Sequence, residues 1–183
     1  PISTKEFIIP NAEEFTTHCI TLIHDTIWIG TNLGAGQIIG DSIQWVYKNK
    51  FPNDHYGIKS ICKDGQGNLW LGSYFQLYRF SPSAGQTDSF PLLQNMDIRD
   101  IQLIRNKIFI GTYGNGYFIY HDDQLIAMPK GRSLELSNTH TFIEDKDGYL
   151  WMSTNRGLYK THLAAVEAFL KDTTIQLDYY AYL

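Results

Sequence analysis

The stretch KDGQGNLWLGS occupies Lys63 to Ser73, and a close relative of it, DKDGYLWMSTNRGLYK, occupies Asp145 to Lys160. Both place a turn rich in Asp and Gly before a Leu-Trp-hydrophobe core. Both continue with a small residue and a hydroxyl-bearing residue. Such an echo indicates an internal repeat, and a repeat predicts further copies elsewhere in the chain.

Two weaker copies complete the pattern. The central aromatic residues are spaced 42, 39 and 42 residues apart, at Trp28, Trp70, Phe109 and Trp151. A hydrophobic residue lies eight or nine positions upstream of each, at Ile20, Ile61, Ile101 and Phe142. A period near 40 residues with several short strands per unit is typical of β-propeller blades.

The turns and the apolar runs predict four strands in each unit. The strand around Trp70 is apolar on both faces, as is the strand around Phe109, which is typical of a strand between two layers. We therefore expect the four central aromatics to be buried between blades. The glycine two residues after the aromatic, as at Gly72, is expected to leave room for a bulky group of the next blade. A short helix is predicted over Leu163 to Leu170.

The predicted fold is all-β, with about four four-stranded antiparallel blades forming a partial propeller over residues 1–183 as a single segment. The repeat units fall approximately at 16–52, 53–95, 96–135 and 136–183. Residues 1–10, with Lys5 to Ile9, are predicted to supply the outer strand of a preceding blade. Thr174 to Tyr182 is predicted to be a late strand.

Such a run of blades is expected to expose an apolar blade face at each end, which soluble monomers avoid. We favour self-association through these open faces, with two copies forming an eight-bladed ring. The alternative is closure of the four blades on themselves, with the N-terminal strand against the last blade.

The composition excludes several classes of protein. The net charge of −4 argues against a nucleic-acid surface, which needs clustered Lys and Arg. No run approaches the roughly 18 apolar residues of a membrane span. The chain starts without Met and without a signal peptide, so we expect an excised piece whose export signal or membrane anchor lies outside it. Cys19 and Cys62 form no CxxC pair and are expected to be buried structural thiols.

The repeated pattern, hydrophobe-x-x-Asp-x-x-Gly-x-Leu-Trp-hydrophobe-Gly-Thr-x-x-Gly-Leu, resembles the two-component regulator propeller repeat. One copy matches it at Asp64, Gly67, Leu69, Trp70, Leu71, Gly72 and Ser73. Another copy matches it at Asp145, Gly148, Leu150, Trp151, Thr154, Gly157 and Leu158. The first and third copies depart from the pattern in the Asp/Gly turn, and the second has Gln76 in place of the third-strand glycine.

The resemblance covers roughly residues 16–161 and implies a sensor. In glycan-degrading gut bacteria, such repeats form seven-bladed propellers on the periplasmic side of a membrane histidine kinase. The implied function is a periplasmic ligand-recognition segment of a two-component signalling protein in the inner membrane. The implied ligand is a glycan or oligosaccharide. A propeller that binds only other proteins is the alternative, because fold alone does not decide function.

Candidate ligand-binding residues fall at one end of the predicted blades. Two residues before each first-strand hydrophobe lie His18, Lys59, Arg99 and His140. The loops after the second strands add Tyr74, Tyr113, Asn115, Asn155 and Arg156. Aromatic, amide and guanidinium groups suit sugars, which need stacking and planar hydrogen bonds. The competing interpretation is that these residues are solvated loop ends that cap the blade interfaces.

An enzyme of the sialidase-like or lyase propeller type is the less favoured reading. A sialidase needs convergent arginines, but Arg79, Arg99, Arg105, Arg132 and Arg156 do not recur at equivalent positions. No G-x-S-x-G motif and no H-x-x-x-H spacing occurs. The run Asp145 to Gly148 starts like a calcium loop but lacks the further ligands, so a hairpin turn is expected. We therefore expect no catalytic residue, metal or cofactor.

Overall fold

The computed structural model describes residues 15–49, 57–131 and 134–182, which contain four four-stranded antiparallel sheets. The first two sheets comprise β1 (Thr17–Ile23), β2 (Thr26–Thr31), β3 (Gly34–Ile39) and β4 (Ser42–Lys48), then β5 (Ser60–Lys63), β6 (Leu69–Gly72), β7 (Leu77–Ser81) and β8 (Gln86–Ser89). The last two comprise β9 (Asp97–Ile104), β10 (Lys107–Tyr113), β11 (Tyr117–His121) and β12 (Gln124–Ala127), then β13 (Thr139–Glu144), β14 (Tyr149–Thr154), β15 (Gly157–His162) and β16 (Tyr180–Tyr182). These sheets confirm the predicted blades.

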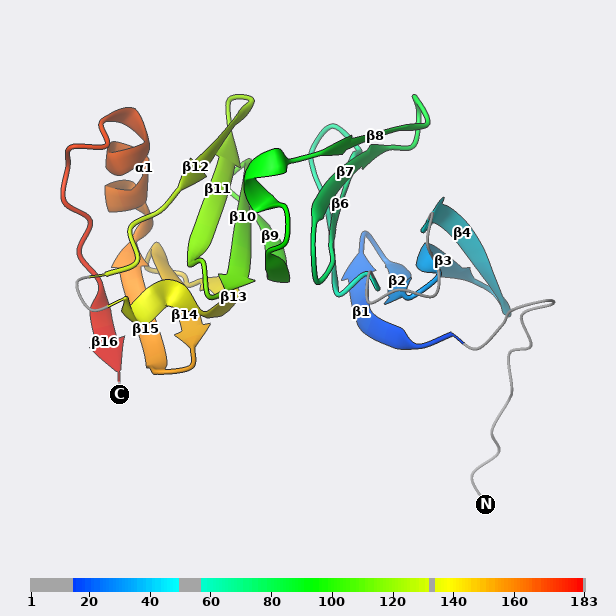
Figure 1. Cartoon of the computed structure of the whole chain (residues 1–183), viewed down its shortest axis with the longest axis horizontal. Helices are drawn as coiled ribbons and strands as arrows, with labels where there is room; N and C mark the ends of the chain where they lie inside the picture. The colour runs from blue at the N-terminus through cyan, green and yellow to red at the C-terminus, as the bar shows by residue number, and fades with distance from the viewer. Residues whose placement is uncertain (1–14, 50–56, 132–133, 183) are drawn as a thin grey trace, which may run out of the picture.

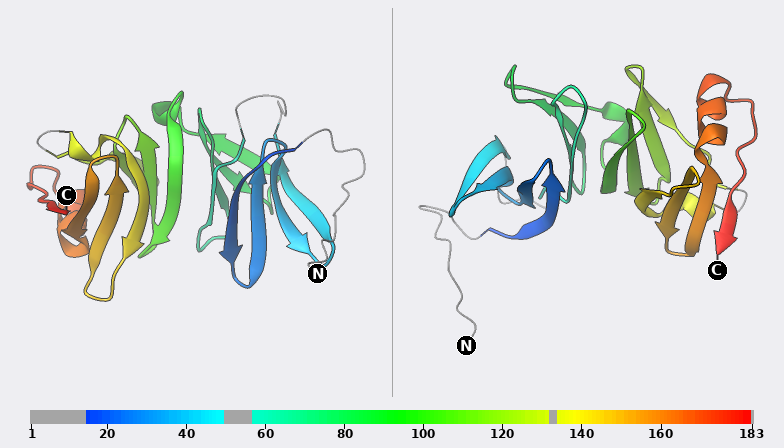
Figure 2. Two further views of the ribbon diagram at one scale, coloured as in Figure 1. Left: turned by 90° about the horizontal axis from the view of Figure 1, so that it is seen from below. Right: turned by 180° about the vertical axis from the view of Figure 1, so that it is seen from behind.

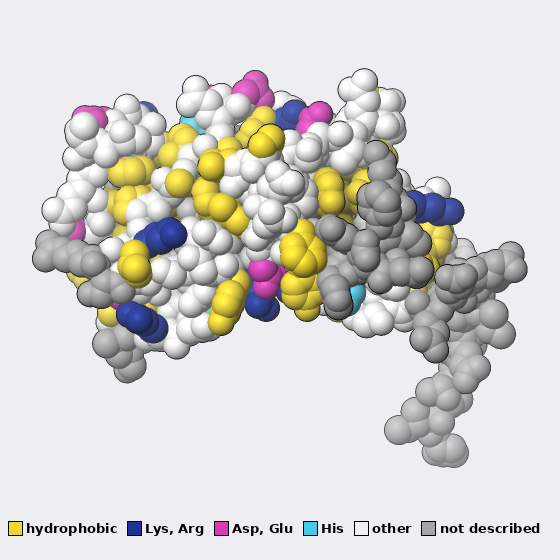
Figure 3. Space-filling view, in the orientation of Figure 1, with side chains coloured by type: hydrophobic (Ala, Val, Ile, Leu, Met, Phe, Trp, Pro, Cys, Tyr) yellow, Lys and Arg dark blue, Asp and Glu magenta, His cyan; other side chains and the backbone are white. Residues whose placement is uncertain are grey.

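The sheets follow one another in chain order along an open arc, and the first and last lie at opposite ends of it (Figures 1 and 2). The alternative in which four blades close on themselves is therefore wrong. Short 3₁₀ turns, η1 (Pro91–Leu93) and η2 (Glu135–Ser137), precede the third and fourth sheets. Figure 3 shows apolar side chains recurring across the face viewed in Figure 1, with few charged groups between them.

A helix, α1 (Leu163–Lys171), is inserted between the third and fourth strands of the last sheet. It begins where the Nδ1 atom of His162 accepts a hydrogen bond from Ala164 N, and it buries Leu163, Val166 and Phe169. This confirms the predicted helix. The late strand is shorter than predicted, because only Tyr180–Tyr182 pairs with β15. The predicted strand at Lys5 to Ile9 lies outside the described residues, and the unit boundaries stay a prediction.

The Asp-rich turns are hairpin connections built around a carboxylate. Asp145 Oδ1 accepts hydrogen bonds from the backbone N–H groups of Asp147 and Tyr149, both at 2.9 Å. Gly148 then takes a φ of 80°, which favours glycine. The carboxylate satisfies backbone donors, so the run Asp145 to Gly148 is a hairpin turn, as expected.

The core lies between neighbouring blades. Trp28, Trp70 and Phe109 are each 1–3% exposed and pack against the following sheet, which confirms their predicted burial. The predicted burial of Trp151 between blades is wrong, because its side chain is only partly buried. The side chains that bury the other three belong to the next blade, and none of the described residues forms a blade after β16.

The small residue after each central aromatic allows close blade contact. A Cβ atom on Gly72 would lie 2.5 Å from Cγ2 of Ile98, in the next blade. A Cβ on Gly111 would lie 2.6 Å from the carbonyl oxygen of Thr139. Both distances are too short for a real side chain. The expectation that this glycine makes room for the next blade is confirmed.

A polar or thiol side chain at one recurring position of the first strand links each blade to the next. We call these side chains the column. Ser60 Oγ accepts a hydrogen bond from Ile101 N at 2.9 Å, and Cys19 Sγ donates to Ile58 O at 3.6 Å. Burial raises the pKa of Cys19 to about 11 and that of Cys62 to about 12. Cys19 is half-buried, Cys62 is buried, and both thiols are free, which agrees with structural thiols.

Asp100 continues this column between the third and fourth blades. Its Oδ2 accepts hydrogen bonds from Thr141 Oγ1 at 2.7 Å and Phe142 N at 3.2 Å. Its Oδ1 accepts from Ile101 N at 2.9 Å and from Gln102 Nε2 at 3.0 Å. Burial raises the pKa of Asp100, and these four donors offset the rise only in part.

Candidate functional site

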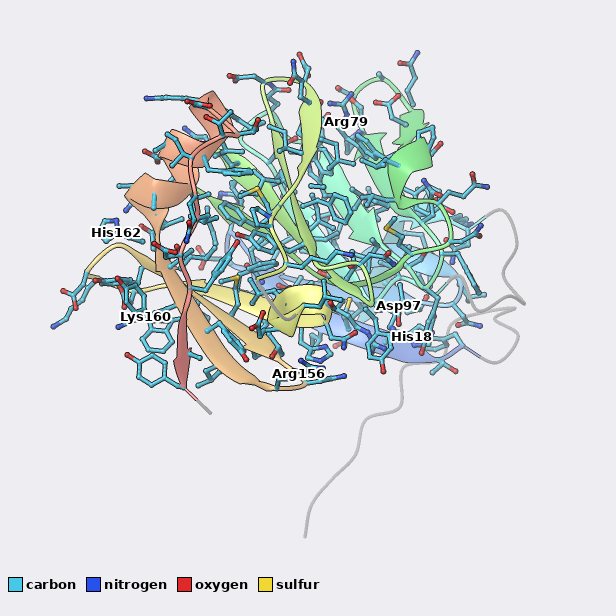
Figure 4. The ribbon with its side chains drawn as sticks, turned by 60° about the vertical axis from the view of Figure 1, so that its left-hand side comes forward. His18, Arg79, Asp97, Arg156, Lys160 and His162 are labelled. Carbon is cyan, nitrogen blue, oxygen red and sulfur yellow. The ribbon has the colours of Figure 1, made fainter. Side chains whose placement is uncertain are left out.

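The predicted ligand-binding residues lie at one end of the blades. We call His18, Lys59, Arg99 and His140 the basic row. Each lies at or next to the start of the first strand of its blade. Figure 4 shows His18, Asp97 and Arg156 toward the lower side of the molecule and Arg79 toward the upper side. Within each antiparallel blade, the first strand begins at the end of the blade where the second strand finishes. The basic row and the predicted loops therefore share one surface.

Two members of the basic row are joined by a carboxylate. Lys59 Nζ lies 2.9 Å from Oδ1 of Asp97, and Arg99 NH2 lies 2.7 Å from Oδ2 of the same side chain. The Lys59 and Asp97 side chains are 14% and 19% exposed, so this pair is better shielded than a typical surface ion pair. One carboxylate facing two cations leaves a net positive charge between the second and third blades.

Each of these cations also lies against a tyrosine ring near the end of a second strand. Tyr74 lies in the loop after β6, whereas Tyr113, which was predicted to lie in a loop, is the last residue of β10. Lys59 Nζ lies 3.5 Å from the ring centroid of Tyr74, and the Arg99 guanidinium carbon lies 5.0 Å from that of Tyr113. Both distances are within cation–π range. The Tyr113 side chain is 48% exposed. The surface therefore combines accessible aromatic area with fixed positive charge.

The fourth blade extends the same surface. The Nε2 atom of His140 lies 2.5 Å from Oδ1 of Asn155, and its ring centroid lies 6.4 Å from that of Tyr113. Arg156 N donates to Thr154 Oγ1 at 3.0 Å, which holds the loop after β14. The structure thus connects Arg99, Tyr113, His140 and Asn155 in one series of contacts. Asn115 lies in the loop after β10.

His18 forms the other end of the row. Its ring lies against Gly57, since a Cβ there would clash with Nε2 and Cδ2 of His18. Burial lowers the pKa of His18, and the positive charge of Lys59 lowers it further. The imidazole is therefore neutral at neutral pH. It can donate or accept a hydrogen bond there without adding charge.

Asp97 is the site residue that sequence reasoning missed. The sequence contained a signal for Asp97, because Asp97 and Arg99 are two residues apart on one strand and therefore share a face. Asp97 also brings Lys59 of the preceding blade into the same cluster. Arg99 Nε is buried and has no hydrogen-bond partner among the described residues, although the NH2 group of the same guanidinium is paired.

Among the described residues, the rest of the molecule offers a groove but no cluster of metal ligands. Within the ranges that the structure describes, no three His, Cys, Asp or Glu side chains are placed to hold a metal ion. A groove of about 700 Å³ lies elsewhere, between α1, β16 and the segment before η2. Its walls include Tyr159, Phe169, Leu177 and Tyr179, and no member of the basic row lines it.

Comparison with protein families identifies the repeats. The model of the two-component regulator propeller matches residues 51–75 and 133–156. These residues contain the two repeat copies that have both an Asp-rich turn and a central Trp. The second and fourth blades carry two-component regulator propeller repeats. The first and third blades lie outside the matched residues, as expected from their shortened turns. No curated protein sequence matches the chain significantly.

Solved structures share the fold of this chain. The extracellular domain of BT3049 from B. thetaiotaomicron, assigned to the hybrid two component systems, aligns with a TM-score of 0.68 at 20% identity over 97% of the chain. The corresponding domain of BT4673 from B. thetaiotaomicron aligns with a TM-score of 0.64 at 23% identity over 91% of the chain. The chain spans 24% and 22% of the length of these two structures.

A structure of an enzyme has the same fold. A catalytically inactive virginiamycin B lyase from Staphylococcus aureus, determined with quinupristin, aligns with a TM-score of 0.64 at 15% identity. The alignment covers 95% of the chain and 58% of the lyase. At these sequence identities the comparisons establish the propeller fold. The function has to be argued from the residues of the candidate site. In the part of the chain that the structure describes, no helix has the length and apolar character of a membrane span.

Proposed function

We propose that this chain is a non-enzymatic, ligand-recognising propeller segment of a two-component sensor, located on the periplasmic side of the inner membrane. Its ligand is an oligosaccharide, held on the surface formed by the basic row and the tyrosines beside it. Two-component regulator repeats at residues 51–75 and 133–156 support the signalling role. The extracellular domains that share the fold support the location.

The observation that carries the ligand proposal is the continuous run of contacts from Lys59 through Asp97, Arg99 and Tyr113 to His140. Sugars bind to surfaces that offer an aromatic face for their C–H groups and rigid polar groups for their hydroxyls. Here the ion pairs fix Lys59 and Arg99 before a ligand arrives, so fewer side chains must be ordered on binding.

The net positive charge favours an oligosaccharide with an acidic group over a neutral one. Asp97 neutralises only one of the two cations that face it. The Arg99 side chain is 34% exposed, so the accessible part of its guanidinium can donate to an additional oxygen. A uronic acid or sulfated sugar would supply such an oxygen. We therefore expect binding of acidic sugars to weaken as salt is raised.

Calorimetric titration with a panel of neutral and acidic oligosaccharides tests the proposal. Tyr113→Ala removes an exposed ring and should weaken binding by about two- to tenfold, as expected for about 0.5–1.5 kcal/mol of lost stacking. Leu92→Ala is the control, because Leu92 is also exposed and lies in η1, away from the row. Both variants should unfold at nearly the same denaturant concentration as the unaltered chain.

The main competing function is a surface for another protein. If no oligosaccharide binds and a protein partner protects the same residues, the sugar part of the proposal fails and the recognition part survives. If a sugar binds and both variants bind it equally, the site lies elsewhere on the molecule.

A further inference from the structure

The two cations that share Asp97, which Figure 4 labels, are not equally accessible. The Lys59 side chain is only 14% exposed, and its Nζ atom lies 2.9 Å from Oδ1 of Asp97 and 3.5 Å from the ring centroid of Tyr74. The Arg99 side chain is 34% exposed and lies against Tyr113, which is 48% exposed. A ligand on this surface can therefore contact Arg99, whereas Lys59 is largely covered by the protein.

Backbone hydrogen bonds between the second and third blades fix this arrangement. Ile98 stands between Asp97 and Arg99 on β9, and its backbone N donates to the carbonyl oxygen of Ser73 in the second blade at 2.9 Å. The Ile98 side chain is fully buried. The backbone N of Lys59 donates to the last residue of β6 at 2.8 Å. The start of β9 is thereby held against the end of β6, and the three charged side chains meet between the two middle sheets.

We call Lys59, Asp97 and Arg99 the charge cluster. Its two cations and single carboxylate together carry one unit of positive charge. Without the charge of Lys59, the carboxylate would serve Arg99 alone and the cluster would be neutral. Without the charge of Asp97, both positive charges would remain. The Asp97 side chain is only 19% exposed, so solvent screens these interactions less than it screens an open surface pair.

We propose that Lys59 and Asp97 set how strongly this surface attracts anions, while Arg99 makes the contact with the anionic group. Asp97 lowers the positive charge at Arg99, and Lys59, which belongs to the preceding blade, prevents its complete neutralisation. Lys59 and Asp97 are therefore positioning residues that act through Arg99. The ligand class is one with a carboxylate or sulfate group, and its being an oligosaccharide rests on the function proposed above.

Three variants place the charge cluster at different charges with side chains of similar shape. Lys59→Gln makes the cluster neutral, Asp97→Asn gives it two units of positive charge, and the double variant returns it to one unit. The affinity for an acidic probe should be weakest for Lys59→Gln, intermediate and equal for the unaltered chain and the double variant, and tightest for Asp97→Asn. Each unit of charge should change the affinity by about fivefold at low salt, as expected for charges several ångströms apart near a protein surface.

Calorimetry with tetragalacturonate and with its neutral methyl ester separates charge from shape. The ester should not distinguish the four proteins, because a distorted surface would affect both probes and an altered charge affects only the acid. Raised salt should compress the series for the acid. Lys63→Gln is the control, since it removes one positive charge at the opposite end of β5 and should leave both affinities unchanged. Circular dichroism confirms that each variant is folded.

Inorganic sulfate, followed through the NMR signals of the Arg99 side chain, supplies the negative charge without the sugar. If sulfate follows the expected order and tetragalacturonate binds none of the four proteins, the charge setting stands and the oligosaccharide ligand is wrong. Weaker sulfate binding to Asp97→Asn than to the unaltered chain would overturn the proposal. A double variant that binds sulfate like Lys59→Gln would overturn it as well, as would Arg99 signals that sulfate leaves unchanged in all four proteins.

Discussion

The indole Nε1 of Trp70 donates a hydrogen bond to Oδ2 of Asp64 at 2.9 Å. The other oxygen of Asp64 accepts from Gln66 N and Asn68 N, so one carboxylate ties the hairpin turn to the central aromatic of the blade. The last blade repeats this arrangement, with Trp151 Nε1 at 2.7 Å from Oδ2 of Asp145. The spacing of six residues from Asp to Trp therefore has a structural role in the second and fourth blades.

Trp70→Ala should destabilise the chain by about 3–5 kcal/mol, because a large buried aromatic leaves a cavity between two blades. Trp151→Ala should cost less, since Trp151 is only partly covered. Denaturant titration measures both changes. A loss below about 1 kcal/mol for Trp70→Ala would show that the aromatic does not join the blades.

Gly72→Ala should destabilise the chain by about 1–3 kcal/mol, the usual cost of overpacking. The added Cβ would meet Ile98 of the next blade, which cannot retreat without moving β9. Gly65→Ala is the control, because a Cβ there meets nothing within 4 Å and Gly65 has no positive φ. If the two substitutions cost the same, the blades are not in close contact at Gly72.

The carboxylate of Asp64 should stabilise the fold more at neutral pH than in acid. Burial raises the pKa of Asp64, but hydrogen bonds from Trp70, Asn68 and Gln66 outweigh it and lower the pKa below the usual 3.8. A lowered folded pKa gives stability that is present above 3.8 and is lost as the pH falls through the folded pKa. The advantage of the unaltered chain over Asp64→Asn should therefore shrink between neutral pH and strong acid.

Asp100 should show the opposite trend. Its folded pKa is raised, so the protonated form is favoured in the fold, and stability falls as the pH rises from below 3.8 through the folded pKa. The unfolding free energy of the unaltered chain relative to Asp100→Asn should be greater in acid than at neutral pH. Parallel pH dependence for the Asp64 and Asp100 variants would contradict the assigned environments.

The repeat spacing was sufficient to predict four sheets, because each copy contains its own turn, inner strand and small residue. The partial exposure of Trp151 could not be predicted from its own copy, since burial depends on the following blade. The links made by Ser60 and Asp100 were also missed, because different residue types serve the same position. Within the candidate site the positions of Lys59 and Arg99 were predicted, whereas their shared partner Asp97 required the contact between blades.

Hydrogen–deuterium exchange with an acidic oligosaccharide added at saturation tests the central claim most directly. The account predicts slower exchange from the end of β10 at Tyr113 to Gly116 and in the loop at Asn155–Arg156, with Tyr113→Ala abolishing the protection. The amides around Phe169 and Leu177, which line the separate groove, should not change. Protection confined to that groove, or no protection with any acidic oligosaccharide, would contradict recognition by the basic row.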